Sequence, residues 1–459
     1  MQYLVFIFPL LFMISFLLGC YKILKGDPNG LFIFLIGGLP FYAISLSTFY
    51  LIGGKNIIPI IQTTKEFVVV LSLGTLLFQY KTLFKWTLLD RLVLLFFIFC
   101  SIYVFLPLGP YGFIQRLLAF KGLSFFPLVY FCGRLFPLRK THLEKYFSFI
   151  LVLTIAAAAL SFGEYLIQTH LQAYTGYSDL NYYVYKQDPS GNYGLTWTFE
   201  IENGTKRFAS FFSTPLEHAA ASIIALAIIA GLYTEKRNQL FLSKFGWIAL
   251  LATVVSILLS LSRAAILSYF AVILIYSFIT KRREILSIFY LTILLFFIYL
   301  FSFSSKEIQD FVMGTITFSN QSSVGHLVEW LTGIESMIAK PLGLGLGSSG
   351  GITANEGDAV GGENQFIIVG VQIGIAGFLL YAWIHFYTIY LAYKNYKLLK
   401  GKEQKIAMTV LLIRVGMFLP MFTSNLDTFI YISYLMWFMT GLLSNILSKP
   451  YADLEHKTV

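Results

Sequence analysis

The sequence predicts an all-α, polytopic integral membrane protein with about twelve to thirteen transmembrane helices and two large external loops. Hydrophobic residues make up 57% of the 459 residues, charged residues only 12%, and the mean hydropathy is +0.74, which is far above the range of soluble domains. The apolar runs approach the roughly 20 residues that a helix needs to cross ~30 Å of hydrocarbon. They lack the two-residue alternation of β-barrel strands.

The net charge of +10 is explained by membrane topology better than by nucleic acid, because cytoplasmic loops collect Lys and Arg. With the N-terminus outside and the C-terminus inside, most basic residues fall in cytoplasmic loops and most acidic residues fall outside. Cys20, Cys100 and Cys132 lie in or beside apolar runs without the spacing of a disulfide or metal site. We therefore expect no nucleic-acid partner, no metal and no cofactor.

Residues 1–167 are predicted to form N-terminal transmembrane helices, near 2–21, 31–53, 67–84, 92–109 and 118–135, with a sixth ending near 167. Lys55, Lys65 and Glu66 are assigned to a short outer loop before the third span. Lys121 falls within the fifth span. A lysine there either faces a polar cavity or extends its ammonium to the membrane surface.

Residues 168–206 form the first external loop, whose many tyrosines either stack on sugar rings or lie at the membrane interface. Residues 207–303 are transmembrane helices that carry Arg207 and Arg263, and Glu217 lies among unusually dense polar residues where the seventh span begins. The tight turn Leu261–Ala265 places Arg263 at the outer membrane boundary. Together with Lys121 on the same side, it can form an anion site, because the guanidinium fork suits phosphate oxygens.

Residues 304–363 form the large external loop, in which residues 324–337, including His326, have the spacing of an amphipathic helix. Three glycines at 345, 347 and 350 have the spacing of a dinucleotide fingerprint, but no strand precedes them. Glu363 and Asn364 stand before an apolar run, where they either cap a helix or carry chemistry. Residues 364–459 are the C-terminal transmembrane helices, near 364–390, 406–422 and 428–447, and a cytoplasmic tail.

Four segments, in order, together resemble the O-antigen polymerase and O-antigen ligase superfamily of bacterial membrane glycosyltransferases. They are Arg207–Pro215, Ser262–Ala265, Trp330–Gly345, and Glu363–Phe366 with Gly374–Leu380. The resemblance implies glycan transfer from undecaprenyl pyrophosphate at the outer face of the cytoplasmic (inner) membrane. No metal or soluble nucleotide sugar is then needed. A flippase and a chain-length regulator are the protein partners that it implies.

The sequence departs from the family at two positions. Ligase-type members usually carry His where Glu363 stands, and many members carry Arg where His326 stands. The first departure favours a polymerase of lipid-linked repeat units for O-antigen, capsule or exopolysaccharide. A ligase that delivers a finished glycan to lipid A core or protein is the alternative, and a flippase or transporter of lipid-linked sugars is a third.

The proposed residues fall into two groups according to their expected roles. Glu363 and Asn364 are expected to act in catalysis. The substrate-binding candidates are Arg207, Arg263, Lys121, His326 and Glu217.

Overall fold

The computed structural model of the chain describes residues 3–79, 85–138, 141–201, 204–234, 239–302, 321–350 and 360–448, with a few single positions between 306 and 319. In these ranges the regular structure is helical, and β-pairing is limited to two isolated bridges. The predicted all-α fold is confirmed. Most of residues 303–320 and all of residues 351–359 in the predicted large external loop, and residues 449–459 of the predicted cytoplasmic tail, lie outside the described residues.

The long helices follow the order of the predicted spans. Their bounds are α1 Ile7–Leu24, α2 Asn29–Gly37 continuing into α3 Tyr42–Leu51, α4 Ile58–Gln79, α5 Leu88–Phe105, α6 Phe113–Ser124, α7 Phe126–Leu135, α8 Leu143–Ile167, α10 Pro215–Tyr233, α11 Lys244–Ser260, α12 Arg263–Thr280, α13 Arg283–Ser302, α15 Gln321–Ala339, α16 Gln365–Asn395, α17 Gly401–Phe418 and α19 Ile430–Leu447. Short elements include α9 Tyr177–Leu180, α18 Pro420–Thr423 and the 3₁₀ turn η9 Leu426–Thr428.

Ten helical runs in the described part of the chain are long and apolar enough to cross a membrane. The pair α6 and α7, bent by 42°, raises the number to eleven if it forms one span, and Pro127 in the first turn of α7 accounts for the break. The other two predicted spans correspond to α13 and to α11, which has only 17 residues. The count by length and composition is therefore lower than the twelve to thirteen predicted.

The third predicted span was placed too late in the sequence. Helix α4 begins at Ile58 and contains both Lys65 and Glu66, which the sequence assigned to a loop. Their charges are compatible with the helix because Lys65 Nζ lies 2.9 Å from Glu66 Oε1, and a paired charge costs much less to bury than an isolated one.

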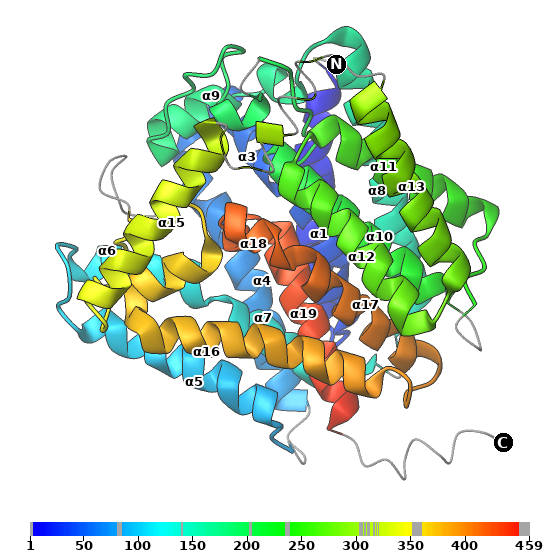
Figure 1. Cartoon of the computed structure of the whole chain (residues 1–459). Coiled ribbons are helices and arrows are strands. Elements are labelled where there is room, and N and C mark those ends of the chain that lie inside the picture. The colour runs from blue at the N-terminus through cyan, green and yellow to red at the C-terminus, as the bar shows by residue number, and fades with distance from the viewer. Residues whose placement is uncertain are drawn as a thin grey trace.

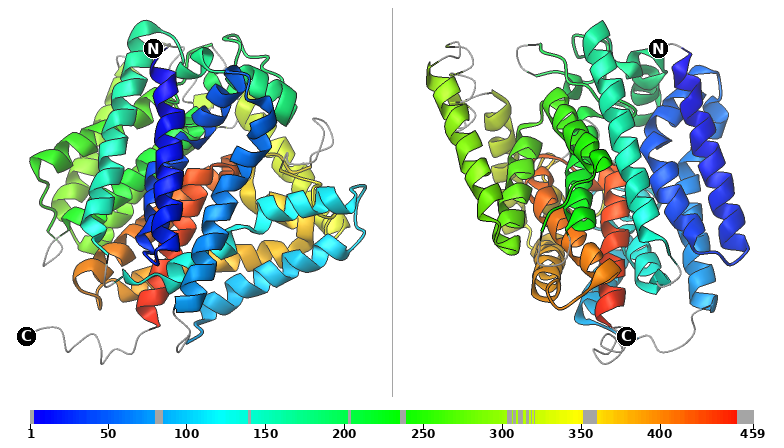
Figure 2. Two further views of the ribbon diagram at one scale, coloured as in Figure 1. Left: turned by 180° about the vertical axis from the view of Figure 1, so that it is seen from behind. Right: turned by 90° about the vertical axis from the view of Figure 1, so that its right-hand side faces the viewer.

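The helices form one bundle in which α1 begins and α19 ends at opposite ends (Figures 1 and 2). We call the end where α1 begins the upper end and the other the lower end. The α2–α3 run, α10 and α19 are the most buried of the spanning helices, whereas α1 lies at the periphery. Helices α7 and α19 approach so closely that a Cβ added at Gly133 or Gly441 would collide with backbone of the other helix. Small residues commonly permit such close contact between membrane helices.

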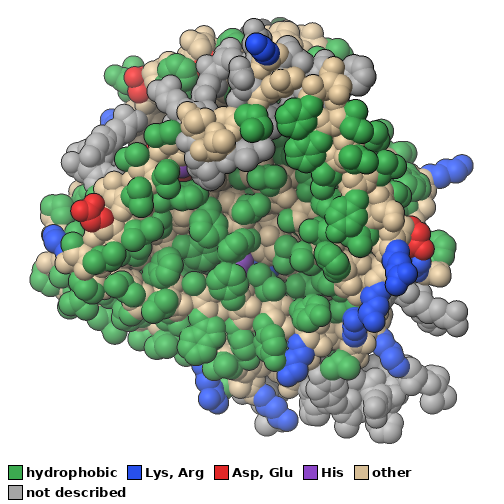
Figure 3. Space-filling model, in the orientation of Figure 1, with side chains coloured by type: hydrophobic (Ala, Val, Ile, Leu, Met, Phe, Trp, Pro, Cys, Tyr) green, Lys and Arg blue, Asp and Glu red, His purple; other side chains and the backbone are tan. Residues whose placement is uncertain are grey.

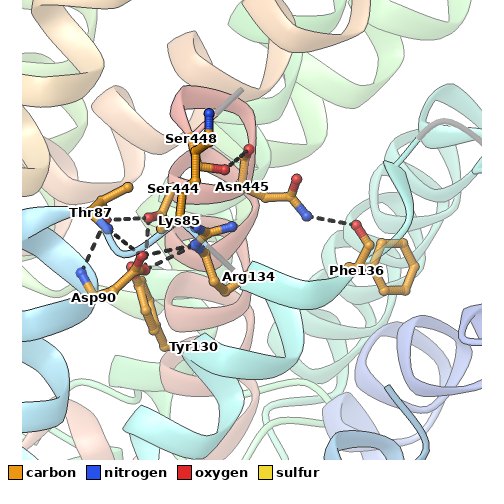
Figure 4. Close-up of polar contacts among 9 residues, drawn as sticks. All are labelled: Lys85, Thr87, Asp90, Tyr130, Arg134, Phe136, Ser444, Asn445 and Ser448. Carbon is orange, nitrogen blue, oxygen red and sulfur yellow. Dashed lines mark hydrogen bonds and ion pairs between the residues drawn. The ribbon is translucent and has the colours of Figure 1, made fainter. Parts of the chain in front are cut away.

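A buried ion pair joins α5, α7 and α19 near the lower end (Figure 4). Arg134 Nε donates to both Asp90 oxygens at 3.0 and 3.1 Å. The same carboxylate accepts from the Tyr130 hydroxyl at 2.5 Å and the Ser444 hydroxyl at 3.0 Å, and from the Thr87 amide at 2.8 Å. These contacts satisfy the carboxylate where water is excluded, so the cluster connects helices that are distant in sequence.

The segment between α8 and α10 packs around a small core of its own at the upper end. Tyr177, Leu195, Phe199 and Ala209 form this core. The helix α15 also lies on the upper half of the bundle, beside the start of α12 (Figure 1).

Candidate functional site

The start of α16 separates the roles of the two adjacent candidates, Glu363 and Asn364. Asn364 is the N-cap, and its Oδ1 accepts hydrogen bonds from the amides of Phe366 at 3.0 Å and Ile367 at 3.2 Å. Asn364 is 2% exposed, whereas Glu363 precedes the cap and is exposed. The capping requirement of the helix is therefore met without the Glu363 carboxylate.

A reciprocal pair of hydrogen bonds anchors this helix start to the turn before α19. Gln365 Nε2 donates to Asp427 Oδ2 at 2.8 Å, and the Asp427 amide donates to Gln365 Oε1 at 3.2 Å. The Ser433 hydroxyl donates to Asp427 Oδ1 at 2.9 Å. Burial raises the pKa of Asp427 to about 6, although the Ser433 hydrogen bond and the Arg414 charge act in the opposite direction. Sequence reasoning missed Asp427 because it is 62 residues from Gln365.

Arg207 and Arg263 lie near each other at the junction between α11 and α12. Arg207 Nε donates to the carbonyl oxygen of Ser260 at 3.0 Å. The chain then turns sharply at Leu261, which has a φ of 47°, and Arg263 is the first residue of α12. Burial, followed by the Arg263 charge, lowers the pKa of Arg207 to about 10, so both guanidinium groups stay charged at neutral pH.

Helix α15 brings His326 and a second carboxylate to the same place. His326 Nδ1 lies 3.7 Å from Glu329 Oε2, and a Cβ at Gly362, where φ is +60°, would collide with Glu329 Oε2. Glu329 therefore lies against the residue next to Glu363. The sequence analysis did not select Glu329. Its spacing of three from His326 on a helix is the signal that would have identified it.

The four groups act on one another electrostatically. Burial raises the pKa of Glu363, as does the Glu329 charge, whereas the His326 and Arg207 charges lower it. The interaction with the Glu329 carboxylate raises the pKa of His326, with a further contribution from the Glu363 charge.

Two other substrate-binding candidates lie in different surroundings. Glu217 is buried at the start of α10, where its Oε2 accepts from the Ser213 amide at 3.0 Å and the Ser213 hydroxyl at 2.5 Å, so its carboxylate stabilises the helix N-terminus. Lys121 Nζ lies 3.2 Å from Glu66 Oε1. Neither Glu217 nor Lys121 is among the charged groups that shift the pKa values of Arg207, Glu363 and His326.

The glycine-rich loop packs against a break in α16, where Ile373 and Gly374 depart from helical backbone angles. Backbone amides of Leu344 and Gly345 donate to the carbonyl oxygens of Val371 and Gln372 at 2.7 and 3.1 Å, and the Gly347 amide donates to Gln372 Oε1 at 2.8 Å. A phosphate-binding loop needs free backbone amides. These three amides already donate to acceptors on α16, so here the glycines permit close packing of the loop on that helix.

One comparison with known proteins gives a match, which covers part of the chain. Residues 248–382 match the protein-family model described as O-antigen ligase, a family of glycosyltransferase-like enzymes. No curated protein matches the chain. The matched region contains Arg263, His326, Glu329 and Glu363, which converge in the structure, while Arg207 reaches the same place from outside it. Residues 248–382 of this integral membrane protein are thus similar to the O-antigen ligase family, which supports the resemblance of the chain to the O-antigen polymerase and O-antigen ligase superfamily.

Proposed function

We propose that the protein polymerises lipid-linked oligosaccharide repeat units, transferring the growing glycan from undecaprenyl pyrophosphate to a sugar hydroxyl of the next lipid-linked unit. The observation that carries the proposal is the convergence of Arg207 and Arg263 with Glu363, a carboxylate that caps no helix. The positive guanidinium groups suit the pyrophosphate leaving group, and the negative carboxylate suits the proton that the nucleophile must lose.

In the proposed reaction the acceptor hydroxyl oxygen attacks the anomeric carbon of the donor glycan. The bond between this carbon and the pyrophosphate oxygen breaks, and the electron pair leaves with the pyrophosphate. Arg207 and Arg263 stabilise the charge that develops there, with charge-assisted hydrogen bonds that contribute roughly 1.5–3 kcal/mol each. Glu363 takes the proton of the attacking hydroxyl, and Asn364 positions Glu363 by capping α16.

The electrostatic setting of Glu363 suits a general base. An ordinary glutamate is too weak a base at neutral pH for efficient proton transfer, and burial together with Glu329 raises its pKa toward the operating range. His326, whose pKa is raised mainly by Glu329, carries more positive charge than an ordinary histidine. It therefore supplies part of the charge that an arginine would supply at this position.

We place the site at the outer face of the bacterial cytoplasmic (inner) membrane. Basic side chains gather toward the lower edge of the bundle (Figure 3), where α16 ends and α17 begins with Lys394, Lys397, Lys400, Lys402 and Lys405. Cytoplasmic loops carry an excess of Lys and Arg, so the upper end, with the site, faces outward. A flippase that supplies the lipid-linked units and a chain-length regulator are the proposed protein partners.

Ligase activity is the second candidate, and the description of the matching family model favours it. Glu363 supports polymerisation instead, because ligase-type members usually carry His at this position. Purified protein incubated with lipid-linked repeat units distinguishes the two activities. A ladder of glycans differing by one repeat unit supports polymerase. A single transfer to lipid A core or protein, without a ladder, would refute it in favour of ligase.

A further inference from the structure

A second cationic cluster lies between α4 and α6. Lys65 Nζ lies 2.9 Å from Glu66 Oε1, and Lys121 Nζ lies 3.2 Å from the same oxygen. The other oxygen, Oε2, is buried without a hydrogen-bond partner. Charged side chains inside a membrane bundle are costly and commonly mark a binding site or an ion path, so the cluster requires an explanation beyond helix packing.

The two lysines differ in how their donors are used. Lys65 is buried, and its ammonium also contacts the Tyr42 hydroxyl at 3.2 Å and the Gln62 carbonyl oxygen at 2.7 Å, which together with Glu66 use its three donors. The Lys121 side chain is 43% exposed, and Glu66 is its one ion-pair partner in the part of the chain that the structure describes. Lys121 therefore has donors to offer to a ligand.

The charges in this cluster do not balance. Two ammonium groups share a single carboxylate, which leaves one positive charge in excess. The charges that act on Lys65 come from Glu66 and Lys121. Within the described residues, no second carboxylate therefore offsets the two ammonium charges. An anionic group next to Lys121 would neutralise the excess charge in surroundings where water is scarce.

The cluster lies at the same end of the bundle as the arginine site but apart from it. Gln62, one turn before Glu66, donates to the Tyr185 hydroxyl at 3.0 Å, which places the cluster beneath the external segment before α10. Tyr434 interacts electrostatically with both Glu66 and Asp427. Since Asp427 holds Gln365, the turn before α19 lies near both the lysine cluster and the start of α16.

We propose that this cluster, through Lys121, binds the pyrophosphate of the second, acceptor lipid-linked unit. The inference rests on the proposed polymerase function, in which both substrates carry a lipid pyrophosphate. The acceptor hydroxyl reacts at one end of the repeat unit, and its pyrophosphate stays intact at the other end. Its binding site must therefore lie away from Glu363, beside but outside the arginine site, as the lysine cluster does. No bond is made or broken there.

The test measures transfer by purified full-length protein to two acceptors, the repeat unit on polyprenyl pyrophosphate and the same repeat unit on an uncharged alkyl tail. In Lys121→Ala, KM for the pyrophosphate acceptor is expected to rise about tenfold or more, the loss typical of one charge-assisted contact. The kcat, the KM for the donor and the KM for the uncharged acceptor should stay unchanged. Lys121→Arg, which keeps the charge, should recover most of the affinity.

Lys55→Ala is the matched control, because Lys55 lies at the same end of α4 but stacks on Tyr50 at 5.0 Å and does not contact Glu66. Lys65 keeps its bond to Glu66 in Lys121→Ala, so the fold should be retained. An unchanged KM for the pyrophosphate acceptor, or equal losses with both acceptors, overturns the second site while leaving the polymerase in place. If wild-type protein extends neither acceptor, the polymerase function itself is refuted, and this site with it.

Discussion

Replacing Glu363 with Gln separates proton transfer from every structural role at this position. Asn364 supplies the helix cap, and no hydrogen bond within the described residues anchors the Glu363 carboxylate. The free energy of unfolding should therefore change by no more than about 0.5 kcal/mol, as for ordinary surface substitutions. The amide cannot accept the proton of the attacking hydroxyl, so kcat should fall by roughly 10²- to 10⁴-fold, which corresponds to about 2.7–5.4 kcal/mol in barrier height.

The pH profile gives the same prediction a second readout. A general base must be ionised, and the pKa of Glu363 is raised by burial and by Glu329. The kcat of the wild-type protein should therefore rise with pH through this raised pKa and fall as pH drops below it. The rising limb should disappear in Glu363→Gln and persist in Glu363→Asp at a lower rate.

The assay is glycan ladder formation from lipid-linked repeat units by purified protein at matched expression. Glu335→Gln is the control, because Glu335 is an exposed carboxylate on α15 and should leave kcat and the pH profile unchanged. A Glu363→Gln variant with wild-type kcat would refute the catalytic role. Glu329, the carboxylate on the other side of Gly362, would then be the next candidate.

Three further substitutions test the rest of the site and the fold. Arg207→Ala should raise the donor KM about tenfold or more while the protein still inserts in membranes. Arg207→Lys should rescue donor binding poorly because the guanidinium fork is lost. A wild-type donor KM in Arg207→Ala would contradict the pyrophosphate site. Asp90→Asn should lower the free energy of unfolding by about 3–5 kcal/mol, since it leaves Arg134 buried without its carboxylate, and an unchanged melting temperature in detergent would refute this role. Gly374→Ala should lower stability by about 1–3 kcal/mol and displace the glycine-rich loop, because φ is +76° and the methyl group would collide with that loop. Gly401→Ala, with φ of +57° but open space, is the control for backbone strain alone, and equal losses of stability in the two glycine variants would contradict the loop argument.

Hydropathy was sufficient to predict the helical membrane fold, because each spanning helix satisfies its own backbone hydrogen bonds and needs only an apolar run. It failed at α4, where Lys65 and Glu66 were taken as loop residues. Their mutual ion pair and the Tyr42 hydroxyl that Lys65 contacts make these charges tolerable inside the helix. The contact to Tyr42 joins residues 23 positions apart, which a local hydropathy window cannot register.

The order of motifs along the chain singled out Arg207, Arg263 and Glu363 as candidates, because each lies beside a local signal: a polar helix start, a tight turn or a helix cap. Sequence alone left the choice between cap and catalyst open at Glu363 and Asn364. The structure decides the cap through the two hydrogen bonds to Asn364, which depend on backbone direction and so on the folded helix.

By itself, the sequence determined that this protein crosses the membrane many times and which segments end at its polar boundary. Only the tertiary structure decided which of those ends meet. It brings Glu329 to Glu363 and Asp427 to Gln365, and it assigns Lys121 to Glu66, away from the charges that act on the two arginines. The physical reason is that apolar periodicity specifies each helix separately, whereas charge pairing between helices depends on how they pack side by side.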